Sequence, residues 1–303
     1  MRRVQVVDKL LPFVEAATVP SDIDITIFNE TSGPLVADCD GIIPVVTTRI
    51  GPVEMDRLRG LKVIANYGVG VDNIDLGAAR ERGIGVSNTP GVLTDATAEL
   101  TWALILATAR RVGEAERLVR SGKWSGWTPT QLRGMSLDGR TLGIIGAGRI
   151  GREVGRRAQA FGMRVVYWSR TRDATLEFVD LDTLLRTADV VSIHLARSSQ
   201  TDGLMDAGKL KLLRDGAILI NTARGSIVDE PALVRELASG RISAGLDVYA
   251  HEPAVPTELL GLENVVLLPH LGSATHEARQ AMWDLAWSNV EAFLGGAALI
   301  SPI

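Results

Sequence analysis

The chain has 303 residues, of which 46% are hydrophobic and 22% charged, so it can bury one large core or two ordinary ones. Its formal net charge of −4 argues against a surface built to neutralise nucleic-acid phosphates or anionic lipid, although small anions can still bind locally. A single cysteine, Cys39, excludes an internal disulfide framework and a cysteine zinc cluster, and no other residues have a metal-ligand spacing.

The N-terminal segment and the most apolar helical stretch bear on where the protein works. The apolar run at the N-terminus is interrupted by Asp8, Lys9 and Pro12, which makes a poor signal peptide. The longest apolar helical stretch, residues 100–109, is too short to cross a bilayer. The sequence therefore predicts a cytoplasmic protein with no membrane and no nucleic-acid partner.

The part of the chain before Thr141 alternates short apolar runs with amphipathic stretches. Strands are predicted near residues 4–7, 23–27, 41–45 and 62–66. Pro90 and Gly91 then interrupt the pattern, Thr94 or Asp95 can cap a helix, and residues 96–111 favour a helix. This pattern predicts one α/β unit followed by a crossover helix.

From Thr141 onward, six apolar runs rich in β-branched residues alternate with amphipathic stretches, at 141–145, 164–168, 190–193, 217–220, 243–246 and 265–268. Six such strands complete one doubly wound domain. Residues 275–294 carry apolar side chains at helical spacing, and this helix is predicted to pack back on the first unit. The predicted fold is α/β with two doubly wound domains: a Rossmann cofactor domain at 95–274 and a discontinuous flavodoxin-like substrate domain at 1–94 and 275–303.

A glycine-rich turn follows the first of these six strands, in the sequence T-L-G-I-I-G-A-G-R-I-G. Gly146 permits a tight turn, Gly148 lets the backbone approach a pyrophosphate, and Gly151 allows a helix to pack closely on the sheet. Backbone amides at the start of that helix, around Arg149 and Ile150, would face the phosphates. A glycine-rich turn without a ligand is the alternative, but the strand-turn-helix context favours a dinucleotide.

The end of the second strand predicts which dinucleotide binds. An NAD site usually has an acidic residue there for the ribose 2′-hydroxyl, whereas this chain has Ser169. Arg170, Thr171 and Arg172 follow, so the loop offers a hydroxyl and two guanidiniums where a carboxylate would repel a 2′-phosphate. This favours NADPH, although an ordinary basic loop has the same composition.

Polar residues follow the last three predicted strands. Ligands bind beyond the carboxyl ends of the strands in open α/β sheets, so side chains at these positions are expected to converge on one crevice. The candidates after the fourth, fifth and sixth strands are Thr222, Ala223, Arg224, Asp247, Glu252, His270 and Gly272.

Reduction of a 2-keto acid needs a cation for the carboxylate, a hydride donor and an acid for the developing alkoxide. Arg224, NADPH and His270 can supply these, and Glu252 beside His270 would stabilise the protonated imidazole and raise its pKa. Taken singly, the arginine can bridge loops, the glutamate can be a solvated turn residue and the histidine can be structural. Together, at the ends of successive strands beside a dinucleotide turn, they favour catalysis.

The other three histidines are weaker candidates. His194 ends the third predicted strand and can touch the cofactor or simply pack locally. His251 and His276 are expected to be an exposed loop residue and an exposed helix-start residue. No catalytic role is assigned to these three.

Five motifs occur in a fixed order along the chain: G-V-G-V-D-N at 68–73, the glycine turn, N-T-A-R-G-S-I-V-D-E at 221–230, G-L-D-V-Y-A-H-E-P at 245–253 and P-H-L-G-S-A-T at 269–275. In these motifs, and over essentially its whole length, the chain resembles the D-isomer-specific 2-hydroxyacid dehydrogenases. The resemblance implies that Arg224 binds the substrate, that His270 is the acid/base and that Glu252 supports it.

The resemblance also implies features that composition alone would not show. The backbone amides of Val69 and Gly70 would bind the substrate carboxylate, while Asp247 and residues 222–224 would contact the nicotinamide. The substrate domain would be discontinuous, with a cleft that closes on hinges. The protein would be a homodimer built largely through its cofactor domains, and residues 124–132, with Trp127, resemble a dimer segment that reaches the neighbouring active site.

Within this family, the segments N-T-P-G-V-L-T-D-A-T-A-E-L, W-S-R-T-R and P-H-L-G-S-A-T-H most resemble the NADPH-dependent glyoxylate/hydroxypyruvate reductases. The chain departs from the usual pattern after His194, where it reads L-A-R-S-S-Q-T instead of a proline-containing loop. Alternatives are an NAD-dependent 3-phosphoglycerate or D-lactate dehydrogenase, and a nucleotide-sensing binding protein like the C-terminal-binding corepressors. Ser169 counts against the phosphoglycerate enzyme, and the NADPH-type loop counts against the corepressor.

Overall fold

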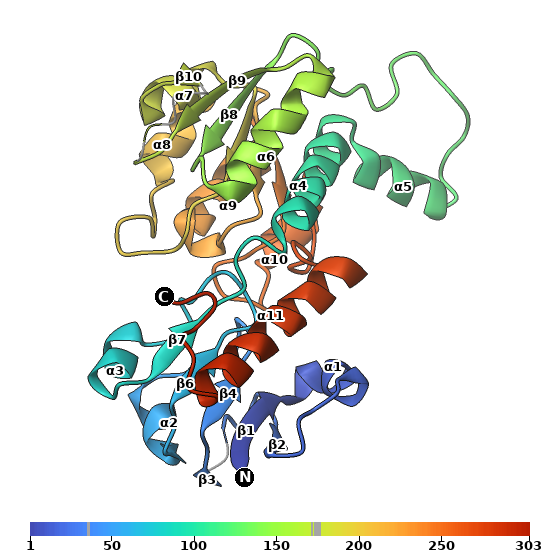
Figure 1. The fold of residues 1–303 in the computed structure, drawn as a ribbon. Helices are drawn as coiled ribbons and strands as arrows, with labels where there is room; N and C mark the ends of the chain where they lie inside the picture. The colour runs from blue at the N-terminus through green and yellow to red at the C-terminus, as the bar shows by residue number, and fades with distance from the viewer. Residues whose placement is uncertain (35–36, 171, 173–176) are drawn as a thin grey trace. The chain divides into compact units, whose positions relative to one another are not determined.

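Two main parallel β-sheets organise the chain, one in each of two compact units (Figure 1). Unit 1 comprises Met1–Leu93 and Ala274–Ile303, and unit 2 comprises Thr94–Ser273. The computed structural model describes residues 1–34, 37–170, 172 and 177–303. None of the helices in these ranges has the length and hydropathy needed to cross a membrane.

Unit 1 is built on a five-stranded parallel sheet with the order β2-β1-β4-β6-β7, which is the flavodoxin-like order. Its strands are β1 (Arg2–Val7), β2 (Ile23–Phe28), β4 (Gly41–Ile43), β6 (Val63–Ala65) and β7 (Gly85–Ser87), and a separate pair joins β3 (Ala37–Asp38) to β5 (Leu58–Arg59). Its helices are η1 (Asp8–Leu10), α1 (Leu11–Ala16), α2 (Pro52–Arg57), α3 (Leu76–Glu81) and α11 (His276–Leu294).

Helix α11 returns the chain to unit 1 and packs over β4 and β6. Thr275 caps the helix, because its hydroxyl accepts the Ala278 N–H at 3.1 Å. Asn289 is a fully buried polar residue in α11, and its side-chain oxygen accepts the N–H groups of Ile300 and Ser301 at 3.0 and 3.1 Å. This buried amide therefore holds the C-terminal residues against unit 1.

Unit 2 is built on a seven-stranded parallel sheet with the order β10-β9-β8-β11-β12-β13-β14. Its strands are β8 (Thr141–Ile145), β9 (Arg164–Trp168), β10 (Glu177–Phe178), β11 (Val190–Ile193), β12 (Ile218–Asn221), β13 (Ser243–Leu246) and β14 (Val265–Leu267). Strand order reverses at β8, whose neighbours are β9 and β11. The carboxyl end of β8 is therefore the topological switch point, where ligands of such sheets bind.

Both faces of the unit 2 sheet are covered by helices, so its central strands β8, β11, β12 and β13 are buried on two sides. Helices α4 (Thr94–Ala109) and α6 (Arg149–Ala158) share one core with β8, and α7 (Leu181–Thr187), α8 (Ala207–Leu212) and α9 (Glu230–Ala238) share the other. Strand β8 supplies fully buried Leu142 and Ile144 to the first core and Ile145 to the second. Burial of each of these side chains contributes about 1.5–3 kcal/mol. The remaining elements are η2 (Gln159–Phe161), η3 (Gly225–Ile227) and α10 (Thr257–Leu260).

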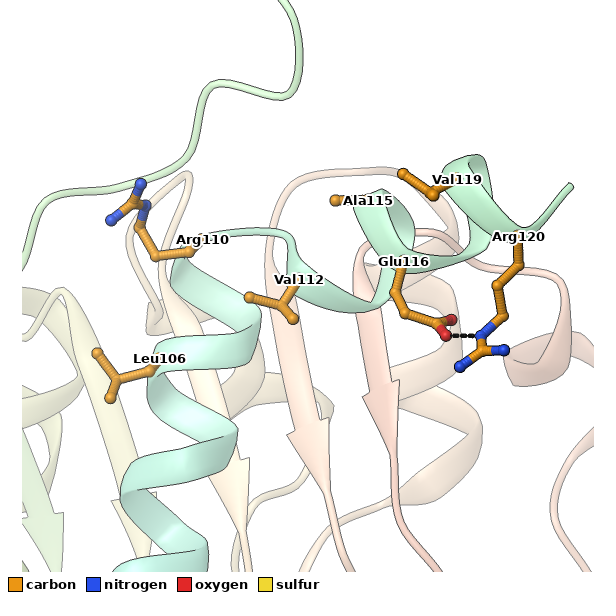
Figure 2. Close-up of a pocket in the computed structure, with 7 residues that line it drawn as sticks. All are labelled: Leu106, Arg110, Val112, Ala115, Glu116, Val119 and Arg120. Carbon is orange, nitrogen blue, oxygen red and sulfur yellow. Dashed lines mark hydrogen bonds and ion pairs between the residues drawn. The ribbon is translucent and has the colours of Figure 1, made fainter. Parts of the chain in front are cut away.

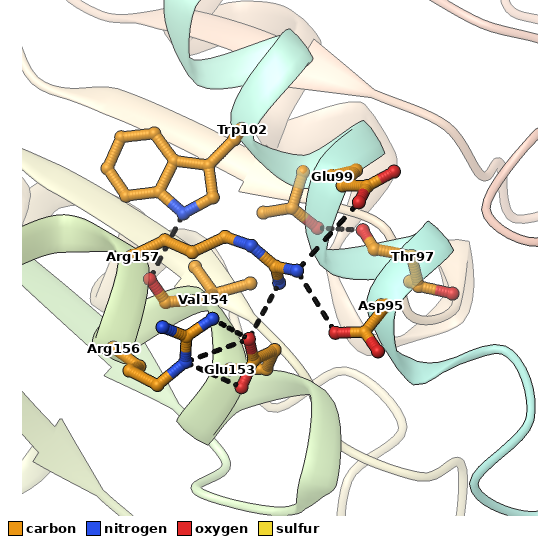
Figure 3. A network of polar contacts seen from close by, with 9 residues as sticks. Asp95, Thr97, Glu99, Trp102, Glu153, Val154, Arg156 and Arg157 are labelled. Atoms are coloured by element: carbon orange, nitrogen blue, oxygen red, sulfur yellow. Dashed lines mark hydrogen bonds and ion pairs between the residues drawn. The ribbon is translucent and has the colours of Figure 1, made fainter. Parts of the chain in front are cut away.

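A polar network joins α6 to the start of α4 (Figure 3). Arg157 on α6 forms ion pairs with Asp95 of α4 at 3.0 Å and with Glu153 of its own helix at 3.2 Å. Trp102 of α4 donates its indole N–H to the Val154 carbonyl oxygen at 3.1 Å. These contacts fix the direction of α6, the helix whose first turn follows the glycine-rich turn.

Helix α5 (Val112–Arg120) and the segment after it, up to β8, extend away from the sheet of unit 2 (Figure 1). No residue of α5 is buried, and Val119 is 60% exposed. Trp124 and Trp127 in the following segment are 53% and 79% exposed. This part of unit 2 therefore presents large apolar side chains to solvent.

The predicted fold class, α/β with doubly wound units, is confirmed, but several elements differ from the prediction. The unit 2 sheet has seven strands instead of six, because the two-residue edge strand β10 has no apolar run to mark it. In unit 1, β3, β5 and β7 were not predicted, since each contains a single apolar residue and so has no apolar run. Helix α4 begins at Thr94 itself, so neither Thr94 nor Asp95 precedes its first turn.

Candidate active site

The glycine-rich turn lies at the carboxyl end of β8, at the switch point. Gly146 has φ +101°, and a Cβ there would lie 2.7 Å from the His194 carbonyl oxygen. A Cβ at Gly151 would lie 2.2 Å from the Gly146 carbonyl oxygen. Gly148 precedes α6, and a Cβ there would meet no atom within 4 Å. The backbone at Gly146 and Gly151 thus has no room for a side chain, whereas the space beside Gly148 is open. This open space fits a pyrophosphate at the N-terminus of α6, beside Arg149 and Ile150.

The loop after β9 adjoins this turn. The Trp168 carbonyl oxygen accepts the Gly146 N–H at 2.8 Å, which places Ser169 beside the turn. Arg170 donates from Nη1 to Gln200 Oε1 at 3.1 Å. The Arg172 guanidinium carbon lies 4.4 Å from the centre of the Phe178 ring, a cation–π contact. Thr171, also predicted to bind the cofactor, lies outside the described residues.

Arg224 follows β12, and its loop is held by buried Asn221. The Asn221 side chain donates to the Arg224 carbonyl oxygen at 2.9 Å and accepts the Ala223 N–H at 3.0 Å. A Cβ at Gly225 would lie 1.9 Å from the Tyr249 carbonyl carbon, so only glycine lets this loop approach the segment after β13. Thr222 contributes a 3.0 Å hydroxyl–hydroxyl contact with Thr101 of α4. Sequence reasoning did not single out Asn221 as a positioning residue, because its role depends on its neighbours.

His270 and Glu252 form the closest ion pair of the predicted site. His270 Nδ1 lies 2.7 Å from Glu252 Oε2, and Glu252 Oε1 accepts the Tyr249 N–H at 3.1 Å. Burial tends to raise the pKa of Glu252, but the hydrogen bond and charge of His270, the Tyr249 N–H and the charge of Arg224 together lower it. Glu252 is therefore a carboxylate at neutral pH, and its two oxygens hold the imidazole and the backbone at once.

The backbone of His270 is held in an uncommon conformation by Asp247. His270 has φ +57°, in the left-handed backbone region that residues other than glycine seldom adopt. Fully buried Asp247 accepts the Leu271 N–H at 2.6 Å and the Gly272 N–H at 2.9 Å, and its carbonyl oxygen accepts the His270 N–H at 2.9 Å. Burial raises the pKa of Asp247, against the lowering effect of these N–H groups and of His270. The backbone that carries the His270 ring is therefore fixed by Asp247. The contact of Asp247 and Gly272 with a nicotinamide stays a prediction.

The arrangement of Arg224, Glu252 and His270 suits proton transfer at a carbonyl. Because Nδ1 faces a carboxylate, it carries a hydrogen in either protonation state, and Nε2 is the nitrogen that gains or loses the working proton. The His270 and Glu252 side chains are 35% and 24% exposed, so a ligand can reach this pair. Unit 2 therefore combines a cation, a supported imidazole and a glycine-rich turn whose open side fits a phosphate.

In unit 1, the predicted carboxylate-binding residues Val69 and Gly70 lie in a turn held by two buried amides. Asn88 donates to the Val69 carbonyl oxygen at 2.8 Å, and Asn66 donates to the Gly70 carbonyl oxygen at 2.7 Å. In a trans peptide the C=O and the next N–H point in opposite directions, so fixing the Val69 carbonyl also fixes the Gly70 N–H. Asn66 and Asn88 were not predicted, and their polar character at strand ends was the available signal. A side chain at Gly68 would collide with Val46.

The remaining histidines and the cysteine differ from His270 in their surroundings. His194 Nε2 lies 2.8 Å from Ser192 Oγ; although part of the ring stays accessible, the protein packed around it lowers its pKa to about 3, so it is neutral. His251 is exposed in the loop before Glu252, and His276 begins α11. Burial raises the pKa of the Cys39 thiol to about 11, which makes it a poor nucleophile.

A separate open hollow lies between the end of α4 and α5, and its lining is mostly apolar (Figure 2). It includes Leu106, Val112 and Val119, with an ion pair between Glu116 and Arg120 at its edge. It shares no residue with the predicted site. Because it opens widely and has no convergent polar groups at its centre, it does not resemble a substrate pocket.

A doubly wound sheet with this phosphate-binding turn at its switch point is the fold of NAD(P)-dependent dehydrogenases, and the chain is an oxidoreductase of that class. Residues 102–272 match the family described as D-isomer specific 2-hydroxyacid dehydrogenase, NAD binding domain. The chain belongs to this family, as its motifs predicted.

Several relatives extend this match over most of the chain. The chain is 47% identical over 272 residues to the glyoxylate reductase of Thermococcus litoralis, covering 86% of this chain and 82% of that protein. It is similar to the NADPH-dependent glyoxylate/hydroxypyruvate reductase of Sinorhizobium meliloti, solved with NADP and malonate, at 35% identity and a TM-score of 0.90 over 100% and 96% of the two chains. It is also similar to the D-lactate dehydrogenase of Aquifex aeolicus, solved with NAD and lactic acid, at 26% identity and a TM-score of 0.85 over 97% and 96%.

Proposed function

We propose that the protein reduces a small 2-keto acid, glyoxylate or hydroxypyruvate, to the 2-hydroxy acid with NADPH as the hydride donor. The observation that carries the proposal is the 2.7 Å contact between His270 Nδ1 and Glu252 Oε2, in the unit that also holds Arg224 and the glycine turn. The substrate is supported by two of the relatives named above, those of Thermococcus litoralis and Sinorhizobium meliloti, which are a glyoxylate reductase and a glyoxylate/hydroxypyruvate reductase.

In this proposal His270 is the acid. Glu252 holds the ring through Nδ1 and stabilises its positive charge, so that Nε2 gives its proton to the carbonyl oxygen as the alkoxide develops. Bound NADPH supplies the hydride to the carbonyl carbon. Arg224 binds the substrate by charge-assisted hydrogen bonds, and its charge orients the keto acid before the proton moves. In the oxidation direction neutral His270 accepts the proton.

Within this proposal, the Gly146–Gly151 turn holds the pyrophosphate, residues 222–224 and Asp247 lie toward the nicotinamide, and Ser169, Arg170, Thr171 and Arg172 recognise the 2′-phosphate. The support on the described residues is chemical: the position that would carry an NAD-binding carboxylate is a hydroxyl, and two guanidiniums follow it. Unit 1 is proposed as the substrate-binding domain, with the Val69 and Gly70 amides binding the carboxylate.

Initial rates with both cofactors test the function. The purified protein should oxidise NADPH with glyoxylate or hydroxypyruvate at a kcat/KM at least about tenfold above that with NADH, the value of one charge-assisted hydrogen bond. Arg170→Ala should raise the KM for NADPH about 10- to 100-fold and leave that for NADH unchanged. Arg186→Ala, an exposed arginine on α7, is the matched control. Equal rates with the two cofactors would contradict the NADPH assignment, and activity confined to 3-phosphohydroxypyruvate or pyruvate would contradict the substrate.

We also propose that the protein is a cytoplasmic homodimer that pairs through the α5 region of unit 2. The exposed Val112, Val119, Trp124 and Trp127 and the apolar hollow of Figure 2 support this, because a surface of that kind is usually covered. Light scattering should give twice the mass of 32.5 kDa, and Trp127→Glu with Val119→Glu should give the monomer mass. A wild-type monomer at micromolar concentration would contradict the dimer.

A further inference from the structure

The loop after β11, Leu195 to Leu204, is held together by hydrogen bonds of its own. Thr201, 5% exposed, sits at its centre. The Thr201 hydroxyl donates to the Ala196 carbonyl oxygen at 2.8 Å and accepts the Ser198 N–H at 2.8 Å. Asp202 accepts the Ser226 hydroxyl at 2.7 Å, which joins the loop to η3. Gln200 lies between Ser199 and Thr201, so its exposed side chain projects from a hydrogen-bonded turn.

This loop and the loop after β9 meet beside the phosphate-binding turn. Strands β9 and β11 flank β8, so the two loops leave the sheet on either side of Gly146. On one side, Gly146 donates to the Trp168 carbonyl oxygen; on the other, a Cβ at Gly146 would lie 2.9 Å from the Leu195 side chain. The hydrogen bond of 3.1 Å from Arg170 Nη1 to Gln200 Oε1 joins the two loops across this point.

We propose that Gln200 is a positioning residue for the recognition of the adenosine 2′-phosphate, acting through Arg170. This inference rests on the proposed NADPH preference and names a residue that sets it. Arg170 is an exposed side chain on a loop end, and such a side chain loses conformational freedom when it binds a phosphate. The Gln200 amide oxygen holds one N–H of the guanidinium in advance, which leaves the other N–H donors of an arginine for the phosphate oxygens.

The chemistry of the amide explains why glutamine suits this position. A carboxylate at position 200 would orient Arg170 equally well but would neutralise its charge and repel the incoming 2′-phosphate. A neutral amide oxygen orients the guanidinium and keeps the positive charge. The loop after β11 thus acquires a role at the nucleotide end of the proposed site.

Calorimetric binding of two small probes tests the inference apart from catalysis. Adenosine 2′,5′-bisphosphate and AMP differ only in the 2′-phosphate, so the ratio of their affinities isolates its recognition. Gln200→Met removes the acceptor at similar size and should weaken the bisphosphate about 3- to 10-fold, with AMP unchanged, because one hydrogen bond to a cation is lost. Ser199→Ala, the exposed neighbour in the same loop, should change neither affinity.

A double-mutant cycle then identifies the route of the effect. With Arg170→Ala as the background, Gln200→Met should have no further effect on the bisphosphate. An equal loss in both backgrounds, an equal loss for AMP, or no loss at all would overturn the positioning role. If Arg170→Ala removes the preference for the bisphosphate and Gln200→Met does not, only the inference fails. If Arg170→Ala leaves that preference intact, the proposed NADPH site fails and the inference fails with it.

Discussion

Unit 2 has a proposed catalytic end, with Arg224 and His270, and a proposed nucleotide end, with Arg170 and Gln200. The two ends hold their side chains in different ways. At the catalytic end, Asn221 and Asp247 are 1% and 0% exposed, and each fixes backbone groups of the loop that carries Arg224 or His270. At the nucleotide end, Arg170 and Gln200 are exposed and meet through a single described hydrogen bond. If the proposed function holds, the geometry of catalysis is built into the backbone, whereas cofactor preference depends on surface side chains.

This difference has an energetic consequence. A buried carboxylate that satisfies two N–H groups cannot be removed without leaving them unpaired, at a cost of about 1–3 kcal/mol each. An exposed hydrogen bond contributes less and can be exchanged without disturbing the fold. Changes at the nucleotide end should therefore alter cofactor choice alone, and changes at the catalytic end should alter the reaction rate by larger factors.

The largest effect should come from His270→Asn. Asparagine tolerates the left-handed backbone at this position, so the loop persists while the proton donor is lost. We expect kcat to fall about 10²- to 10⁴-fold with little change in the melting temperature. Steady-state rates with glyoxylate and NADPH would measure it, and His251→Asn, in an exposed position, is the control. A near-normal kcat would remove the acid role and with it the catalytic half of the comparison.

Arg224→Gln should have the next largest effect. The substitution removes the cation and keeps a polar side chain, so kcat/KM for the keto acid should fall about 10- to 10³-fold, mainly through KM. The affinity for adenosine 2′,5′-bisphosphate should not change. Arg235→Gln, exposed on α9, provides the control in the same assays. A loss of nucleotide affinity equal to the loss of keto acid affinity would mean that the two ends are not separate.

Glu252→Gln should slow the reaction less, by about 10- to 100-fold, since the imidazole stays but its anionic partner is lost. The pH dependence of the rate should also change, because the imidazole has lost its anionic partner. The folded pKa of Glu252 lies below its usual 4.5, so the pair contributes stability above that pH and loses it as the pH falls through the folded pKa. A pH–rate profile identical to that of the wild type would contradict the pairing; Glu258→Gln on α10 is the control.

The smallest effect concerns His194, which directly follows β11. Its folded pKa is about 3, below the usual 6.5, so the unfolded chain binds the proton more tightly. Stability is therefore complete above pH 6.5 and falls as the pH drops toward 3, by on the order of 1–2 kcal/mol at pH 5. Urea unfolding of His194→Gln should show a smaller loss between pH 7 and pH 5 than the wild type. The same loss in both proteins would show that this buried ring does not set the acid sensitivity of unit 2.

Much of the fold could be predicted because it depends on local patterns. The apolar runs at β8 and β11 are continuous because parallel strands are covered on both faces, and such runs are visible in a sequence. Strands β7 and β10 were missed because each contains a single apolar residue, and only their pairing with β6 and β9 defines them as strands. Their own side chains do not distinguish them from loops.

The predicted catalytic residues share a simple property: each follows a strand whose carboxyl end reaches the same edge of the sheet. Arg224, Glu252 and His270 could be predicted as a set for that reason, because strand order within a doubly wound sheet is strongly constrained. The hydrogen bonds that hold the loops of the two units could not be predicted. Asp247 contacts Gly272, 25 positions away, and in unit 1 Asn88 contacts Val69, 19 positions away.

The sequence by itself determined the class of fold, the glycine turn and the chemical groups available at the strand ends, because hydrophobic periodicity and glycine positions are properties of short segments. Only the tertiary structure decided which carbonyl or N–H each buried amide and carboxylate satisfies, and that the exposed Gln200 meets Arg170 across the end of β8. The physical reason is that hydrogen-bond partners are chosen by distance and direction in space, and sequence separation contains neither.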